Sequence, residues 1–127
     1  MARVTGVGGI FFKCSDPRAL SEWYARVLGL STEDWGGVIF KSDAAGSPQL
    51  VWNPFKQDTD HFAPSSREIM INFTVDDLDA MIDRLSRNGV EILGRDDQDT
   101  FGRFAWFMDP ANIKIELWEP HRPKQSA

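Results

Sequence analysis

The sequence predicts a mixed α+β fold built from two strand–helix–strand–strand–strand modules (βαβββ), with the helices outside the sheet. The first observation behind this prediction is an internal repeat: IFFKCSDPRALSEWYARVLGL, which starts at residue 10, matches INFTVDDLDAMIDRLSRNGV, which starts at residue 71. In each copy a short apolar strand runs into an acidic turn and then into an amphipathic helix. The second observation is that WGGVIF and VWNP in the first half are echoed by TFGRFAWF and LWEP in the second.

The two copies occupy residues 7–54 and 69–120, and the polar segment 55–68 (FKQDTDHFAPSSRE) is interpreted as the linker between them. Each copy has only about 50 residues and could hardly bury a sheet alone. The 127 residues are therefore expected to form one domain in which the copies pack together. Residues 58–62 (DTDHF) are assigned to the linker, with closure of a cavity mouth as the alternative.

The first predicted helix starts at an N-cap provided by Ser15 or Asp16 and has Pro17 near its first position, where a missing N–H is tolerated. It ends at Gly29, because glycine readily adopts the left-handed conformation that closes helices. Its apolar face, spaced by three and four residues, comprises Leu20, Trp23, Tyr24 and Val27.

The second predicted helix has the same organisation. It starts at an N-cap near Asp76 or Asp77 and ends at Gly89. Its apolar face comprises Leu78, Met81, Ile82 and Leu85.

The stretch FAWFMDPANIKIELWEP, residues 104–120, predicts a strand, a turn and a final strand. Side chains alternate along a strand, so the branched apolar residues of the final strand share one packed face. The opposite face carries Lys114, Glu116 and Trp118. A carboxylate amid so much apolar surface lies either on a solvated sheet face or in a functional site.

Composition argues against several classes of function. The net charge is −5 with both signs interspersed, so no basic stripe exists for nucleic acid. No run approaches the roughly 18 apolar residues of a membrane span, and the start does not resemble a signal peptide. The single cysteine, Cys14, cannot form an internal disulfide, so a cytoplasmic location is expected.

WYARVLGL in the first helix and GRFAWFMDPANIKIELWEP near the end resemble the vicinal oxygen chelate (VOC) superfamily, the group of glyoxalases, bleomycin-resistance proteins and extradiol dioxygenases. The resemblance extends from Val7 to Pro120, with Ala111 where the turn before the last strand usually has glycine. It implies that each module curls its part of the sheet around a cup and that the paired modules enclose a small-molecule cavity.

In this superfamily four residues on the first and last strands of the modules typically bind a divalent metal inside the cup. Carried over, the positions are Gly9, Leu50, Met70 and Glu116, and only the last supplies a donor suited to such a metal. A shift of one residue would bring Gln49 to the cup in place of Leu50, which still makes only half of a site. The resemblance therefore implies a VOC protein without the usual metal, and no cofactor is expected.

Glu116 is the candidate catalytic residue, because its carboxyl could bind a donor on a ligand or act as a general acid or base. The alternative is a family relic exposed at the end of the strand. Its neighbours Lys114 and Asn72 would supply a cation and a hydrogen-bond donor, and the two histidines, His61 in the linker and His121 in the tail, are expected to be solvated. The candidate ligand-binding residues are Phe11, Trp52, Met70, Asn72, Lys114 and Trp118.

Two classes of function stay open on these residues. One is a metal-independent binding protein or enzyme that holds a small, partly aromatic or apolar molecule in the cup. The other is a metal-dependent glyoxalase-type lyase or dioxygenase whose metal site is completed differently, for example through a partner subunit. An interaction module with a filled core is the third choice. A homodimer is also expected, because so many aromatics leave apolar surface that a short chain covers poorly.

Overall fold

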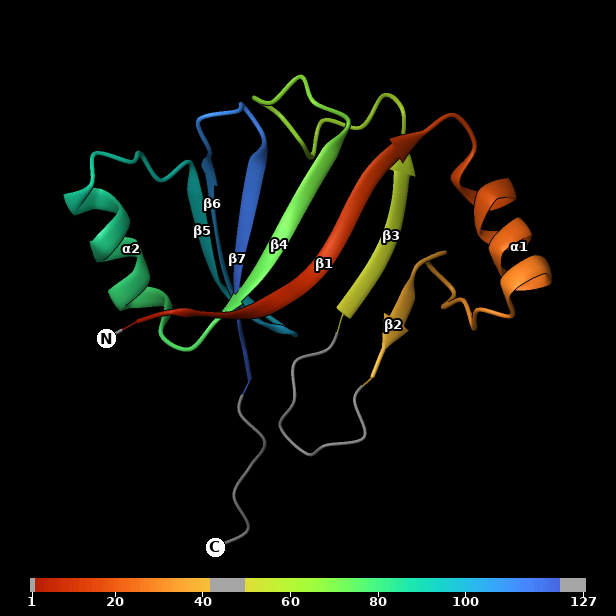
Figure 1. Cartoon of the computed structure of the whole chain (residues 1–127), viewed down its shortest axis with the longest axis horizontal. Helices are drawn as coiled ribbons and strands as arrows, with labels where there is room; N and C mark the ends of the chain where they lie inside the picture. Colours follow the sequence, from red (N-terminus) through yellow and green to blue (C-terminus); the bar gives the residue numbers. More distant parts are fainter. Residues whose placement is uncertain (1, 42–49, 122–127) are drawn as a thin grey trace, which may run out of the picture.

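The structure, a computed structural model, describes residues 2–41 and 50–121. In chain order its elements are β1 (Val4–Cys14), α1 (Pro17–Leu28), β2 (Val38–Phe40), β3 (Leu50–Lys56), β4 (Ile69–Val75), α2 (Leu78–Arg87), β5 (Gly94–Asp99), β6 (Gly102–Met108) and β7 (Lys114–Pro120). These strands form one curved, open sheet in the order β2-β3-β1-β4-β7-β6-β5 (Figure 1). The predicted class, a mixed α+β fold with a cup-like sheet and outer helices, is confirmed.

The centre of the sheet is the antiparallel pair of β1 and β4, which come from different halves of the chain. In each half the first strand pairs in parallel with the last, β1 with β3 and β4 with β7. The second half has three strands after its helix, whereas the described part of the first half has two. Before β2 the first half has a turn, in which the N–H of Gly36 donates to the carbonyl of Glu33. The φ of Gly36 is 92°, a backbone conformation that glycine adopts more readily than other residues.

Both helices begin at aspartates that the sequence indicates. Asp16 Oδ1 accepts the N–H of Ala19 at 3.1 Å, and Asp77 Oδ1 accepts the N–H of Ala80 at 3.1 Å. Each carboxylate thus satisfies one of the N–H groups left unpaired at a helix start. Gly29 ends α1 with a φ of 73°, as predicted. Neither helix of the described chain is long and apolar enough to cross a membrane.

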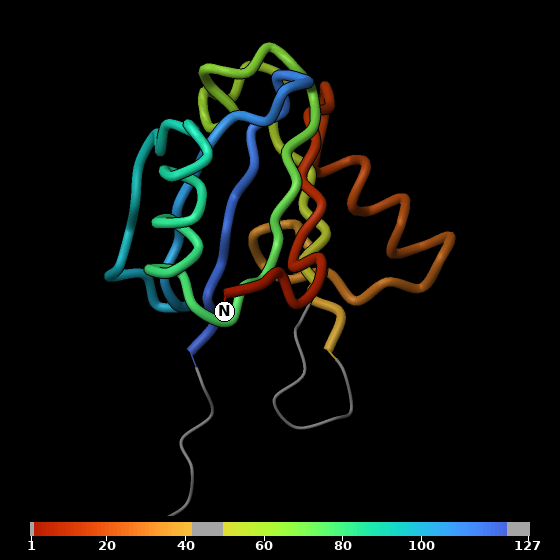
Figure 2. The backbone as a smooth tube through the Cα atoms, turned by 60° about the vertical axis from the view of Figure 1, so that its left-hand side comes forward, coloured from red at the N-terminus to blue at the C-terminus, as the bar shows by residue number. Residues whose placement is uncertain are grey.

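The two helices cover opposite ends of the sheet (Figures 1 and 2). Helix α2 packs on β6 and β7, and α1 packs on β3. The core between α2 and the sheet has as its buried members Ala2, Val75, Leu78, Met81, Ala105, Ile115 and Leu117. The apolar face of β7 is therefore turned toward α2, which leaves the face of Glu116 for the concave side of the sheet.

Helix α1 packs less closely than its sequence predicts. Tyr24 packs against Trp52 with its ring tilted and the ring centroids 4.7 Å apart, but Trp23 and Val27 are 45% and 52% exposed. The buried side chain of this helix is Ser21, whose Oγ donates at 2.6 Å to a backbone carbonyl of the loop before β2. Trp23 and Val27 belong to the predicted apolar face but stay largely exposed, because α1 packs mainly on β3 near the edge of the sheet.

The segment between β3 and β4 folds over one end of the sheet, where Figure 1 shows it at the top beside the turn before β7. Phe62 is completely buried there in a cluster with Phe11 and Met70. Ser65 Oγ donates to the carbonyl of Asn112 at 2.6 Å and ties the segment to that turn. These residues therefore have a packing role and close one end of the cup.

Candidate functional site

The concave side of the sheet holds a cavity of about 360 Å³. Its large apolar side chains are mainly aromatic: Phe11, Trp35, Phe55, Phe101, Phe104 and Trp118. Its polar side chains are Asn53, His61, Asn72 and Glu116. The wall draws on strands from both halves of the chain, so neither half forms the cavity alone.

Four of the predicted site residues line this cavity: Phe11, Asn72, Glu116 and Trp118. They lie on the neighbouring strands β1, β4 and β7. The parallel register of β4 and β7 places Asn72 opposite Glu116, although the two are 44 residues apart in the chain. Strand pairing therefore brings the amide and the carboxyl together.

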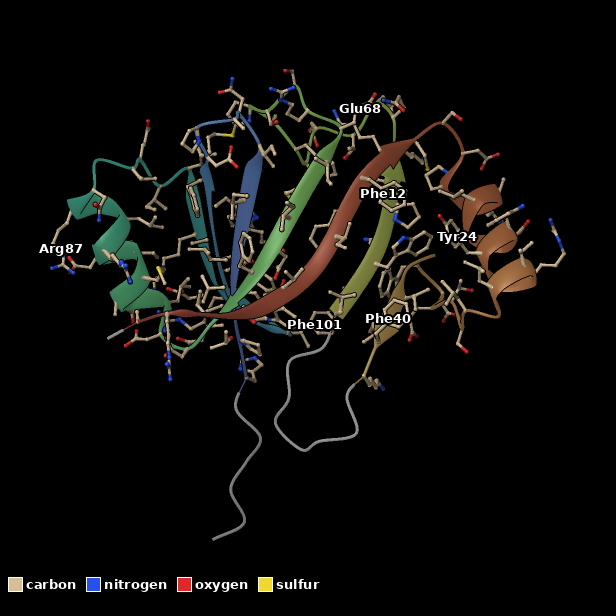
Figure 3. All side chains as sticks on the ribbon, in the orientation of Figure 1. Phe12, Tyr24, Phe40, Glu68, Arg87 and Phe101 are labelled. Atoms are coloured by element: carbon tan, nitrogen blue, oxygen red, sulfur yellow. The ribbon has the colours of Figure 1, made fainter. Side chains whose placement is uncertain are left out.

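Trp52 does not reach the cavity, which corrects the prediction for this residue. The odd-numbered residues of β3, from Val51 to Phe55, line the cavity. Trp52 lies on the other face, where its ring is 5.4 Å from that of Phe12 and close to Tyr24. Figure 3 shows Phe12 and Tyr24 on the side of the strands that faces α1. Matching the tryptophans of the two halves was one residue out of register, and one residue is enough to reverse a strand's faces.

Met70 and Lys114 have the expected strand parity but do not line the cavity, a second correction. Met70 is completely buried against Phe62 and fills the closed end of the cup. Lys114 Nζ donates to the carbonyl of His61 at 2.6 Å and lies 5.8 Å from the ring of Trp106. Lys114 thus holds the β3–β4 segment in place.

His61 is the main site residue that the sequence analysis missed, since it was expected to be solvated. Its Nε2 lies 3.9 Å from Glu116 Oε2, and its ring stacks on Phe55 with centroids 5.4 Å apart. The alternative interpretation of residues 58–62, that they cover the mouth of a cavity, would have indicated a place for His61 in the site. Phe104 was also missed, although it lies opposite Trp118 and alternation along β6 could have indicated it.

Glu116 is 6% exposed, and both of its carboxylate oxygens accept hydrogen bonds. Asn72 Nδ2 donates to Oε1 at 2.6 Å, and Trp106 Nε1 donates to Oε2 at 2.7 Å. Glu116 is therefore held in a fixed orientation inside the cup and is not exposed at the end of the strand.

Burial perturbs the ionisable groups of the site. It raises the pKa of the Glu116 carboxyl, although the N–H groups of Trp106 and Asn72 act in the opposite direction. Burial also lowers the pKa of His61, and the charge of Lys114 lowers it further. The pKa of Lys114 is itself lowered by burial, against the attraction of Glu116. The pKa values of Glu116 and His61 thus move toward each other.

One polar atom of the site has no partner in the described part of the chain. Asn72 is 2% exposed, and its Oδ1 accepts no hydrogen bond because Nδ2 is the end that faces Glu116. A buried acceptor left unpaired costs free energy, and a donor on a bound molecule would remove that cost.

A family comparison identifies the chain. The model of the glyoxalase-like domain matches residues 9–117. The chain belongs to the glyoxalase-like domain family. A comparison with curated proteins found no match.

Solved structures share the fold of this glyoxalase-like domain. Methylmalonyl-CoA epimerase from Mycobacterium tuberculosis matches with a TM-score of 0.65 and 24% identity over 95% of this chain and 91% of that chain. A variant of the Streptomyces coelicolor methylmalonyl-CoA epimerase in complex with 2-nitronate-propionyl-CoA has a TM-score of 0.66 and 19% identity, covering 93% of this chain and 99% of that chain. A glyoxalase/bleomycin resistance protein/dioxygenase superfamily member from Vibrio splendidus has a TM-score of 0.56 and 14% identity, covering 94% of this chain and 99% of that chain. These likenesses confirm the predicted VOC fold.

The glyoxalase-like domain has few donors at the positions where the VOC resemblance implies metal ligands. Gly9 offers none, and Met70 is enclosed by apolar side chains. The register of β3 puts Val51 on the cavity side in place of Leu50, and neither has a donor. Gln49, the alternative ligand, lies outside the described residues.

The hydrogen bonds of Glu116 also disfavour a metal. An N–H points at each carboxylate oxygen, so a divalent ion would have to share each oxygen with a hydrogen-bond donor, Asn72 or Trp106, that faces the same carboxylate. Within residues 2–41 and 50–121, no three His, Cys, Asp or Glu side chains are grouped to hold an ion. The described residues do not fit the family's metal. A metal-free protein stays a prediction, which elemental analysis of the purified protein tests: near one equivalent of Zn, Ni, Mn or Fe per chain would contradict it.

Replacing Gly8 with alanine is expected to lower the free energy of unfolding by about 1–3 kcal/mol. Gly8 lies in an irregular stretch of β1 and lines the cavity. A Cβ at this position would lie 2.4 Å from Asn72 Oδ1 and 2.8 Å from Trp118 Cε3, so buried side chains of the site would have to move. Urea denaturation measures the loss.

The control for this prediction is Gly94→Ala in β5. A Cβ at Gly94 would meet its nearest neighbour, Trp106 Cε3, at 3.7 Å, which is an ordinary contact. Equal stabilities of Gly8→Ala and Gly94→Ala would contradict the close packing around Asn72.

Proposed function

We propose that this glyoxalase-like domain binds a small, largely apolar molecule in its cup, against the Glu116 carboxyl and without the metal of the family. The observation that carries the proposal is an aromatic-walled cavity of about 360 Å³ with one buried carboxyl in its wall. This volume lies near the lower end of the range for small-molecule sites, which suits a compact molecule with a ring. An open cavity argues against a module with a filled core.

The role of the polar side chains follows from their positions. Glu116 is oriented by Asn72 and Trp106, and Asn72 Oδ1 remains free to accept from a ligand. A few fixed polar groups in an apolar wall orient a small ligand and make its binding specific.

One observation favours a second candidate, an enzyme that moves a proton on the bound molecule. His61 Nε2 and Glu116 Oε2 are 3.9 Å apart, which is too far for a direct hydrogen bond but close enough for both atoms to contact the same ligand atom. Burial raises the pKa of Glu116 and lowers that of His61, so Glu116 holds a proton more readily than an ordinary glutamate and His61 less readily than an ordinary histidine. In this candidate Glu116 takes a proton from the ligand or returns it, and His61 exchanges it with solvent.

A fluorescence titration tests the proposed binding. The probe is 2-naphthylmethanol, a neutral aromatic alcohol, and the signal is the emission of the tryptophans, two of which, Trp35 and Trp118, line the cavity. We expect saturable binding of one probe per chain. Val51→Phe fills the cavity and should weaken binding at least about tenfold. Native mass spectrometry of freshly purified protein should also show a retained small molecule.

The matched control is Val7→Phe, at an exposed position of β1 that does not line the cavity. It should bind the probe as the wild type does. Equal affinities for Val51→Phe and Val7→Phe would show that the probe does not bind in the cup.

We also propose that the protein is a homodimer. The helices lie at the ends of the sheet, so the outer face of the central strands β1 and β4 is left with exposed Ile10 and Ile69. Sedimentation should give twice the 14.4 kDa chain mass at micromolar concentration. Ile10→Asp should lower the sedimenting mass to that of the monomer. Leu93→Asp, at a position of similar exposure before β5, should leave the dimer intact. A wild-type protein that sediments as a monomer would contradict the proposal.

A further inference from the structure

We propose that the cup selects a molecule with a positive charge, such as a protonated amine, attached to an aromatic or apolar body. This inference rests on the proposed function of the cup as a small-molecule site and adds the charge of its ligand. It is carried by the charge and the hydrogen-bonding character of the cavity wall.

The charge of the wall is one-sided. Among the described residues that line the cavity, none is lysine or arginine, and Glu116 is the carboxylate. An anionic group placed in the cup would face that carboxylate with no cation in the wall to offset the repulsion. The 2-nitronate-propionyl-CoA bound to the compared epimerase is such a ligand, and this wall has no charged partner for it.

The unengaged hydrogen-bonding atoms beside Glu116 are acceptors, and Asn53 in the wall both accepts and donates. Asn72 Oδ1 is buried and unpartnered, and the Glu116 carboxylate has lone pairs beyond the two bonds it accepts. His61 Nε2 lies beside that carboxylate and accepts a hydrogen bond in the neutral tautomer that carries its proton on Nδ1. A protonated amine has several N–H donors and no acceptor, so it complements this set.

The aromatic rings add a second attraction for a cation. Phe104 and Trp118 lie nearly parallel, at 4°, with centroids 6.0 Å apart, and Phe11 and Phe55 contribute rings from β1 and β3. The faces of such rings attract cations, and aromatic cages bind organic ammonium groups in this way. A neutral ligand of the same shape gains the apolar contact alone.

The charged groups around Glu116 strengthen the preference. The negative charge of Asp99 on β5 acts on Glu116, and that of Asp60 in the β3–β4 segment acts on Lys114. With Glu116 itself, three carboxyl groups of the described chain lie around the site and one ammonium group, that of Lys114. The neutral groups that face Glu116 are His61, Asn72 and Trp106. A bound cation should therefore favour the ionised form of the Glu116 carboxyl over the protonated form.

Three probes of similar shape and different charge test the inference: 2-naphthylmethylamine, 2-naphthylmethanol and 2-naphthoate. By calorimetry at pH 7 with the full chain, the amine should bind about tenfold or more tightly than the alcohol, and the carboxylate should bind most weakly.

Variants connect the preference to the site. Glu116→Gln should bring the amine and the alcohol to similar affinities, whereas Glu91→Gln, at an exposed carboxylate outside the cavity, should leave the preference intact. Equal binding of amine and alcohol by the wild type, or tightest binding of 2-naphthoate, would overturn the charge preference and leave the small-molecule site standing. Absence of binding by all three probes would overturn the proposed function as well.

Discussion

The Phe62→Ala variant is expected to unfold with a free energy about 3–5 kcal/mol below that of the wild type. Phe62 is 0% exposed, and its ring lies 5.2 Å from the ring of Phe55. It packs against Phe11 and Met70 on the paired central strands β1 and β4. Strands held in register by their hydrogen bonds cannot collapse into the space that the ring vacates, so the full cost of a cavity applies.

Phe101→Ala is the control, because Phe101 is 61% exposed and lies at the lower end of the sheet in Figure 3. Its stability should change by no more than about 0.5 kcal/mol. Its affinity for 2-naphthylmethanol should fall, since this ring lines the cavity. Urea denaturation measures both variants. If the free energies of unfolding of Phe62→Ala and Phe101→Ala differ by less than about 1 kcal/mol, the β3–β4 segment is not packed into the cup.

At Glu116, leucine and glutamine are expected to have very different effects on stability. Leucine leaves the N–H groups of Asn72 and Trp106 without their acceptor, so Glu116→Leu should lose about 2–4 kcal/mol. Glutamine can keep both contacts. Its carbonyl accepts from Trp106, and its amide donates to Asn72 Oδ1 once the Asn72 amide has turned over, which leaves Nδ2 in place of Oδ1 as the atom without a partner.

The pH dependence of stability separates the carboxyl from the amide. Burial raises the pKa of Glu116 in the folded state above its value in the unfolded chain, so the protonated form stabilises the fold. This contribution is complete below the unfolded-state pKa and is lost as pH rises through the raised, folded-state value. Thermal unfolding from about pH 4 upward should therefore show the wild type losing Tm relative to Glu116→Gln, which does not titrate at this position. Parallel curves would contradict a buried, titrating carboxyl.

Function at Glu116 is tested with the same pair of proteins. Glu116→Gln keeps the shape of the side chain but removes its charge and its ability to transfer protons. A large loss of ligand binding or turnover without any loss of Tm near neutral pH would place Glu116 in the working site. A variant that binds the retained ligand and turns over substrate as the wild type does would remove Glu116 from it.

The local pattern of the sequence determined the class of fold. Asp16 and Asp77 cap the helices as predicted, because capping depends on one side chain and an N–H three residues away. Alternation along β7 correctly separated the face of Glu116 from the face packed on α2, since the period of a strand is local. The resemblance carried by the last strands indicated the cup.

The register of β3 could not be predicted in the same way. Val51 lines the cavity and Trp52 faces Tyr24, the reverse of the expected parity. Repeated segments of unequal length align only approximately, and an error of one residue exchanges the two faces of a strand. Tertiary pairing with β1, which places Gly9 beside Val51, decides the parity.

By itself the sequence determined the α+β class, the helix caps, the face of β7 that carries Glu116 and the membership of a superfamily, all of which depend on local periodicity or on contiguous motifs. The sequence also indicated Asn72 as a donor to Glu116, but only the tertiary structure fixed that contact and brought Trp106 and His61 to the carboxyl. Asn72 reaches it through the register of two strands far apart in the chain, and His61 comes from a segment whose polar composition is typical of a solvated linker. That segment is held on the cup by Lys114 and by the burial of Phe62, and such long-range contacts leave no periodic signal in the chain.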